Sequence, residues 1–348
     1  MIKWPGKKLA VWAMTPKGAE LALRIEEKWD HADVFLPAKL GVLSESNSFT
    51  SFSHRLEEMF TQYEGHYFIM ATGIVVRVVA KLLKDKTMDP AVVTGDEAGH
   101  FVISLVSGHI GGANELAREL ASILDAQPVI TTSTDVNQAP SIDVIARDQK
   151  LYIENPRAIK PVSMAFIQNQ ALPLHDPYNL VRPHLPHALI EAPVKFFPTR
   201  SGVFADYEVR DLPEQVLVLR PKCLVAGIGC RRGVPKKELE SFILGVFKTH
   251  RLSIHSLARI VSVDLKAKEP GLNQLAADLG APIRFYSTHE LNQVKRVPNP
   301  SFLVDKHIGV KSVCEAAAIL ATGQHHLIVA KQTGKTATIA IAAMPFTS

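Results

Sequence analysis

A histidine, His109, lies inside a glycine-rich turn between a predicted strand and a predicted helix, in residues 101–124, FVISLVSGHIGGANELARELASIL. Turns of this kind often hold anions, because glycines let backbone N–H groups approach a ligand without an intervening Cβ. Polar side chains beside the turn can satisfy the first donors of the helix. We therefore predict an anion-binding turn that carries one titratable group. Its residues are Ser107, Gly108, His109, Gly111, Gly112 and Asn114.

A structural interpretation of the same turn is equally open. Glycines between a strand and a helix often serve only the turn and close helix packing, and His109 would then be a capping or surface histidine. The run SGHIGGAN also lacks the G-x-G-x-x-G pattern, and no acidic residue follows in the expected context. A dinucleotide-binding site is therefore not indicated here.

Polar loops flank the turn on both sides in the sequence. Asp96 and Glu97 precede the strand that leads into it, and Thr131, Thr132 and Asp135 belong to the loop ITTSTD after the next short strand. Ligands in open α/β sheets bind at the carboxyl ends of the strands. We expect these three loops to converge on one site.

An earlier strand, HYFIMAT, ends at another candidate binding segment. Thr72 ends this strand, Gly73 begins the following helix, and Arg77 lies on the polar side of the valine-rich turns of that helix. Arginine matches the geometry of a carboxylate, so Arg77 is a candidate substrate ligand. An ordinary solvated helix face is the alternative.

Glycines and arginines recur near the start of the last third of the chain, in GIGCRRG. Gly227 and Gly229 open a turn after a predicted strand, and Arg231 and Arg232 are placed to bind carboxylates, with a solvated basic pair as the alternative. The nearby TGKT at residues 333–336 lacks the earlier glycine of a P-loop. We interpret it as a hairpin turn between two strands.

The elements that must position these residues alternate between strand and helix patterns from residue 8 to about 140, and again after residue 221. Alternation of this kind predicts mainly parallel sheets with helices on both faces. Ten of the 22 prolines lie between Pro156 and Pro221, which argues against long helices there. We predict an α/β fold of three parts: an N-terminal α/β domain at 1–142, a small Pro-rich middle module at 143–220, and a C-terminal α/β domain at 221–348.

Composition narrows the possible partners and location. The net charge is +5, but the basic residues are dispersed and no nucleic-acid-binding motif accompanies them. No apolar run is long enough to span a bilayer, and the start is a poor signal peptide, so we expect a cytoplasmic protein without membrane contact. The three cysteines form no C-x-x-C pair, and His184 and His187 lie among prolines, so no metal site is predicted.

Several long runs resemble the CbiG family, the cobalt-precorrin-5A hydrolases of anaerobic cobalamin biosynthesis. In the first part these are residues 71–117 and PVITTSTDVN, and in the last part LVAGIGCRRGVPKKELE, SVDLKAKEPGL, PNPSFLVDKHIGVKSVCEAAAIL and TATIAIA. The resemblance covers most of the chain. It departs only in details such as SLVSGH and ITTSTD.

The resemblance implies an enzyme that opens the δ-lactone of cobalt-precorrin-5A and releases acetaldehyde to give cobalt-precorrin-5B. Such chemistry needs a base, an oxyanion site and a proton relay. We expect His109 to be the base, with Asp96, Glu97 or Asp135 orienting it or relaying a proton. The substrate carries its own cobalt, so no cofactor is expected. The alternative is a non-catalytic tetrapyrrole carrier of the same pathway. Transient contacts with other pathway enzymes are compatible with either role, and the sequence leaves the oligomeric state open.

Overall fold

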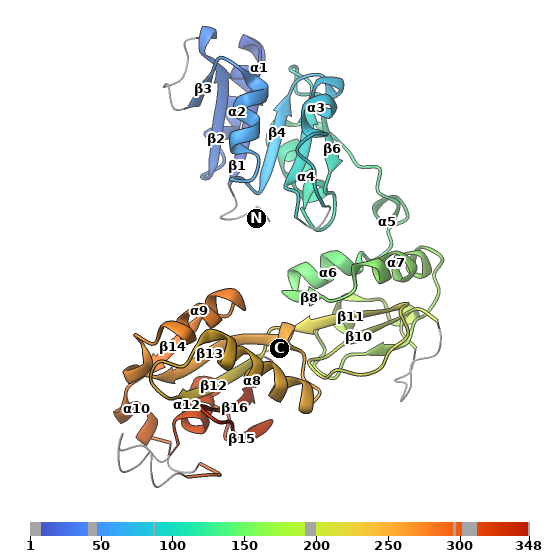
Figure 1. The fold of residues 1–348 in the computed structure, drawn as a ribbon. Helices are drawn as coiled ribbons and strands as arrows, with labels where there is room; N and C mark the ends of the chain where they lie inside the picture. The colour runs from blue at the N-terminus through green and yellow to red at the C-terminus, as the bar shows by residue number, and fades with distance from the viewer. Residues whose placement is uncertain are drawn as a thin grey trace. The chain divides into compact units, whose positions relative to one another are not determined.

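The computed structural model describes residues 8–40, 47–85, 88–191, 200–294, 297–300 and 312–346. The chain divides into a first unit, residues 1–144, and a second unit, residues 145–348. Each is described by itself below (Figure 1). The predicted boundaries at 142/143 and 220/221 remain predictions.

The first unit is built on a seven-stranded sheet of order β3-β2-β1-β4-β5-β6-β7. Strands β3, β2, β1, β4 and β5 run parallel, whereas β6 is antiparallel to β5 and β7 is parallel to β6. The expected mainly parallel sheet is therefore confirmed, with a reversal at β6. The strands are β1 (Leu9–Ala13), β2 (Ala32–Pro37), β3 (Ser48–Phe49), β4 (Gly65–Ile69), β5 (Ala91–Gly95), β6 (Phe101–Val106) and β7 (Gln127–Val129).

Helices cover both faces of this sheet, so its central strands are buried on both sides. Alternate residues of β1 enter different cores: Val11 packs with α1 and α4, while Trp12 packs with α2 and α3. Thr15 caps α1 by accepting from the Gly18 N–H at 3.1 Å, with Pro16 at the first position of the helix. The helices are α1 (Pro16–Glu26), α2 (Phe52–Met59), α3 (Thr72–Val79), α4 (Ala113–Leu124), α5 (Ser133–Val136) and α6 (Ile142–Asp148), the last crossing the unit boundary.

The second unit contains two sheets, of which the five-stranded one has the order β14-β13-β12-β16-β15. Strands β12, β13 and β14 are parallel, and β16 is antiparallel to both β12 and β15. The predicted hairpin at TGKT is confirmed, because it joins β15 to β16. The strands are β12 (Leu224–Cys230), β13 (Leu257–Val263), β14 (Ile283–Tyr286), β15 (Val329–Thr333) and β16 (Ala337–Ala343).

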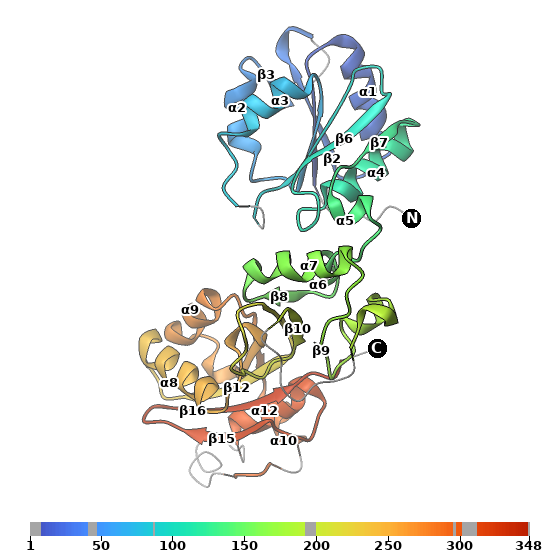
Figure 2. The same ribbon diagram turned by 90° about the vertical axis from the view of Figure 1, so that its right-hand side faces the viewer.

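Helices again cover both faces of the five-stranded sheet (Figure 2). Buried side chains of α8 and α9 pack against Ile228 and Ile260 on one face, and those of α12 pack against Val225 and Val261 on the other. The α/β class predicted for this part is confirmed. The helices are α8 (Lys236–Thr249), α9 (Pro270–Asp278), α10 (Thr288–Asn292) and α12 (Val313–Thr322).

The proline-rich segment forms a four-stranded sheet of order β8-β11-β10-β9, with one longer helix beside it. Pro161 lies in the first turn of that helix, where a missing N–H breaks no intrahelical bond. Tyr152 stacks on His255 at a ring distance of 4.2 Å, and Tyr178 on Phe346 at 4.3 Å, which ties this segment to the five-stranded part. Its elements are β8 (Leu151–Ile153), α7 (Ile159–Ile167), β9 (Leu174–His175), β10 (Gly202–Ala205) and β11 (Val216–Pro221).

Candidate functional site

The predicted histidine turn and the loop after β7 come together at one edge of the first unit's sheet. Strands β6 and β7 are parallel neighbours, so their carboxyl ends lie side by side. The turn leaving β6 carries His109, and the loop leaving β7 runs into α5 with Thr134 and Asp135. Helix α6 adds Asp143, a residue outside the predicted set.

Three polar side chains hold the imidazole of His109. Its Nδ1 lies 3.2 Å from Asp143 Oδ2, and its Nε2 lies 2.8 Å from Thr134 Oγ1 and 3.3 Å from Asp135 Oδ2. The imidazole is 22% exposed, whereas Asp143 and Thr134 are buried. The Thr134 hydroxyl, the His109 imidazole and the Asp143 carboxylate thus lie in a row, and the Asp135 carboxylate lies beside Nε2.

This environment favours the charged form of His109. The hydrogen bond to Asp143 is the largest influence and raises the pKa of the imidazole; burial acts the other way, and Asp135 adds a further upward contribution. Both ring nitrogens are also occupied by neighbours within the chain. His109 is therefore better placed to donate a proton than to act first as the base expected from the sequence.

Asp135 is the centre of a second set of hydrogen bonds. Its Oδ2 accepts from Thr132 Oγ1 at 2.6 Å and from Asn114 Nδ2 at 2.9 Å, and its Oδ1 pairs with Arg118. Burial raises the pKa of this carboxyl, but the hydrogen bonds from Thr132 and Arg118 outweigh burial, and the net pKa is lowered. Asp135 is thus an ionised anchor of the site.

Asn114 is part of this anchor and not a free ligand. Its Oδ1 accepts from Ser104 Oγ at 2.7 Å while its Nδ2 donates to Thr132 and Asp135, and the residue is 3% exposed. The predicted substrate contacts of Asn114 and Thr132 are therefore replaced by structural ones. Thr131, next to them, is exposed at the surface of the loop.

Asp96 and Glu97 lie at the opposite edge of the sheet, which corrects the predicted convergence of three loops. Asp96 accepts from the Phe101 N–H at 2.7 Å, at the start of β6, whereas His109 follows the end of that strand. Six strand residues span roughly 17 Å, so neither carboxylate reaches the imidazole. Glu97 instead accepts from Thr15 Oγ1 at 2.8 Å.

The predicted segment at the start of α3 belongs to this opposite edge as well. Met70 N donates to Gly95 O at 3.0 Å, which places the end of β4 beside the end of β5. Thr72, Gly73 and Arg77 follow in α3, with Arg77 exposed in the last turn. These three residues are not part of the His109 cluster.

The glycines around His109 serve the turn itself. Gly112 has φ 86°, a left-handed conformation that side chains rarely adopt, and it precedes the first residue of α4. A Cβ at Gly108 would lie 2.8 Å from Asn114 Oδ1, and one at Gly111 would overlap Ser107. The left-handed φ and these contacts account for glycine at the three positions, and their role in ligand approach stays a prediction.

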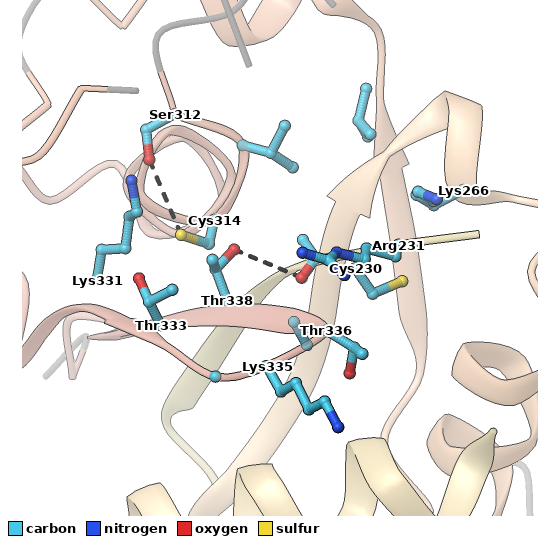
Figure 3. A pocket seen from close by; sticks show the side chains of 15 residues that line it. Cys230, Arg231, Lys266, Ser312, Cys314, Lys331, Thr333, Lys335, Thr336 and Thr338 are labelled. Carbon is cyan, nitrogen blue, oxygen red and sulfur yellow. Dashed lines mark hydrogen bonds between the residues drawn. The ribbon is translucent and has the colours of Figure 1, made fainter. Parts of the chain in front are cut away.

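A second candidate site lies in the second unit, at the carboxyl ends of β12 and β13 (Figure 3). A pocket of about 370 Å³ opens between these strands, the β15–β16 hairpin and the start of α12. Gly229 and Arg231, two of the predicted binding residues, line it, and Lys266, Lys331 and Lys335 also line it. Arg232 is exposed and is not among the lining residues.

Gly227 has a packing role in place of the predicted binding role. A Cβ there would overlap the carbonyl oxygen of Cys314, because α12 lies backbone to backbone against β12. This close approach brings Ser312 and Cys314, at the start of α12, to the pocket wall. In Figure 3 the Ser312 and Cys314 side chains point toward each other at the helix start.

Comparison with known proteins identifies the family to which these features belong. The model "Cobalamin synthesis G N-terminal" matches residues 54–135, "Cobalamin biosynthesis central region" matches 140–221, and "Cobalamin synthesis G C-terminus" matches 224–342.

Individual relatives match along almost the whole chain. A protein named cobalt-precorrin-5A hydrolase from Priestia megaterium is 33% identical over 97% of this chain and 95% of its own. A protein of the same name from Salmonella typhimurium is 35% identical over 96% of this chain and 97% of its own. A crystal structure of a cobalamin biosynthesis protein G homologue from Sulfolobus solfataricus covers 97% of both chains at 23% identity, with a TM-score of 0.37.

Proposed function

The chain belongs to the CbiG family, and on that premise we propose that it is a cobalt-precorrin-5A hydrolase of cobalamin biosynthesis. The names of the two hydrolase relatives, which match almost the whole chain, support the activity. The observation in the structure that supports it is the His109 cluster, in which Asp143 and Thr134 hold a partly exposed imidazole. This arrangement suits proton transfer to and from a substrate oxygen.

Opening of the δ-lactone requires a proton for the departing ring oxygen. Water adds to the lactone carbonyl, the acyl C–O bond breaks, and the ring oxygen leaves as an alcohol while the acyl group becomes a carboxylate. The two protons of the attacking water pass to bulk solvent. The imidazolium of His109 donates that proton when the ring oxygen takes the place of Thr134 or Asp135 at Nε2. Asp143 stays on Nδ1 and holds the ring in orientation.

Release of acetaldehyde reverses this proton transfer. The new alcohol becomes the aldehyde carbonyl when its C–C bond to the macrocycle breaks, so its hydroxyl proton must leave and the remaining carbon must gain a proton. After the first step His109 is neutral, and its unprotonated Nε2 accepts the hydroxyl proton. One imidazole thus serves as acid and then as base.

The experiment that tests this function is incubation of the purified protein with cobalt-precorrin-5A, followed by measurement of acetaldehyde. We expect catalytic release of acetaldehyde with formation of cobalt-precorrin-5B. Binding of the corrinoid with no acetaldehyde above the protein-free control would contradict the proposal and favour a carrier.

A further inference from the structure

The pocket of the second unit has the chemistry of a carboxylate site. Its lining contains no aspartate or glutamate among the described residues. Hydroxyl groups and two thiols complete the polar lining, and apolar wall is supplied by Val263 and Val313. The basic lining residues are Arg231, Lys266, Lys331 and Lys335, and the hydroxyl residues are Ser312, Thr333, Thr336 and Thr338.

Nearby acidic groups neutralise only part of this charge. Glu269 lies 3.5 Å from Lys266 Nζ, and Glu238 accepts from Thr336 Oγ1 at 2.6 Å. No carboxylate among the described residues forms an ion pair with Arg231, Lys331 or Lys335. A pocket with an excess of positive charge attracts anions, and added salt weakens this attraction.

The fold places these charges together by joining distant segments. Arg231 follows β12, Lys331 lies in β15, and Lys335 lies in the hairpin turn between β15 and β16. The first turn of α12 also faces the pocket through Ser312 and Cys314, and the amino-terminal end of a helix favours negative charge. Two independent features, the basic side chains and the helix start, therefore favour the same sign of ligand.

We propose that this pocket binds acetate and propionate carboxylates of the corrinoid and so anchors the substrate through the second unit. This inference rests on the proposed function for the identity of the ligand. A volume of about 370 Å³ lies near the lower end of small-molecule sites, which span about 300–1,000 Å³, and suits one edge of a large polycarboxylate. Arg231, Lys331 and Lys335 supply the charge, while the four hydroxyls supply hydrogen bonds.

The test measures binding separately from turnover. Cobyrinic acid, a stable corrinoid polycarboxylate, is the probe, and the corresponding heptaamide, in which amides replace the carboxylates, is its neutral counterpart. The test variant combines Arg231→Gln, Lys331→Gln and Lys335→Gln. The control variant combines Lys160→Gln, Lys237→Gln and Lys248→Gln, which are exposed outside the pocket lining and lower the net charge by the same amount.

We expect the test variant to bind cobyrinic acid about tenfold or more weakly, because each exposed charge pair changes affinity by up to about fivefold. The control variant should keep wild-type affinity, and the difference should shrink at high salt. Circular dichroism and thermal unfolding establish that each variant is folded. Equal loss of affinity in both variants, or no loss in either, would overturn the inference.

A second readout follows from Cys230, which lines the pocket and is half-buried, while Cys223 and Cys314 are 2% and 1% exposed. Cobyrinic acid should slow maleimide labelling of Cys230 in the wild-type protein, and the heptaamide should not. Unchanged labelling would contradict occupancy of the pocket. Both readouts are independent of acetaldehyde release. Carboxylate binding in this pocket can therefore be refuted while the hydrolase activity is confirmed, and the hydrolase activity can be refuted while carboxylate binding is confirmed.

Discussion

Replacement of Asp143 by asparagine should weaken catalysis without removing the substrate site. Asp143 is buried, and its Oδ2 lies 3.2 Å from His109 Nδ1. A hydrogen bond between charged groups contributes about 1.5–3 kcal/mol. Without this hydrogen bond, His109 loses that contribution to its orientation and protonation. We therefore expect kcat to fall about ten- to a hundredfold, since about 1.4 kcal/mol corresponds to a factor of ten.

The pH dependence of kcat/KM distinguishes the acid role of His109 from the base role. Because Asp143 raises the pKa of His109, the imidazolium needed for lactone opening is present at low pH and lost as pH rises through that pKa. In the Asp143→Asn variant, the fall of kcat/KM at alkaline pH should therefore begin at a lower pH than in the wild type. Asp143→Glu should reverse part of that shift.

Asp148→Asn, at an exposed position on the same helix, is the matched control and should behave as wild type. The reasoning would be refuted if kcat/KM of Asp143→Asn fell at the same alkaline pH as that of the wild type. It would also be refuted if the wild-type activity rose as pH passes through the pKa of His109.

Glu97→Gln should leave acetaldehyde release within about twofold of wild type, because Glu97 bonds Thr15 at the far edge of the sheet; a larger loss would contradict that placement. Gly227→Ala should lower the free energy of unfolding in urea by about 1–3 kcal/mol through overlap with Cys314. Gly245→Ala, on α8 with open space beside it, should instead raise that free energy by up to about 1 kcal/mol. His66 is buried with its pKa lowered to about 4 by burial, so stability should fall by about 3 kcal/mol as pH drops from about 6.5 to 4, and the imidazole NMR signals of the folded protein should show neutral His66 at pH 5.5.

Local patterns predicted the parts of the fold that depend on neighbouring residues. Thr15 and Pro16 mark a helix start by their own chemistry, and the TGKT hairpin follows from a short turn between two apolar runs. The meeting of His109 with the loop before Asp135 also follows from strand order, since two consecutive strands joined by a helix tend to lie parallel and adjacent.

The reversal at β6 was missed although the sequence carries a signal for it. Only five residues, 96–100, separate β5 from β6, whereas a parallel crossover needs about a dozen or more. A hairpin was therefore the physically allowed connection, and it moves Asp96 and Glu97 to the other edge.

Other parts of the site depend on contacts that no local pattern specifies. Asp143 reaches His109 across 34 residues, and the obstacle at Gly227 is a carbonyl 87 residues away. Lys331 and Lys335 join Arg231 only because β16 pairs with β12 in the observed register. These relations are products of tertiary packing, which a single sequence does not display.

Acetaldehyde release by the wild-type protein and by His109→Asn, each supplied with cobalt-precorrin-5A at saturating concentration, tests the central claim most directly. The account predicts repeated turnover by the wild type. It predicts a loss of about 10²-fold or more in the variant, with the fold and corrinoid affinity retained, because the loss falls on proton transfer. Near-wild-type release of acetaldehyde by a folded His109→Asn protein would contradict it.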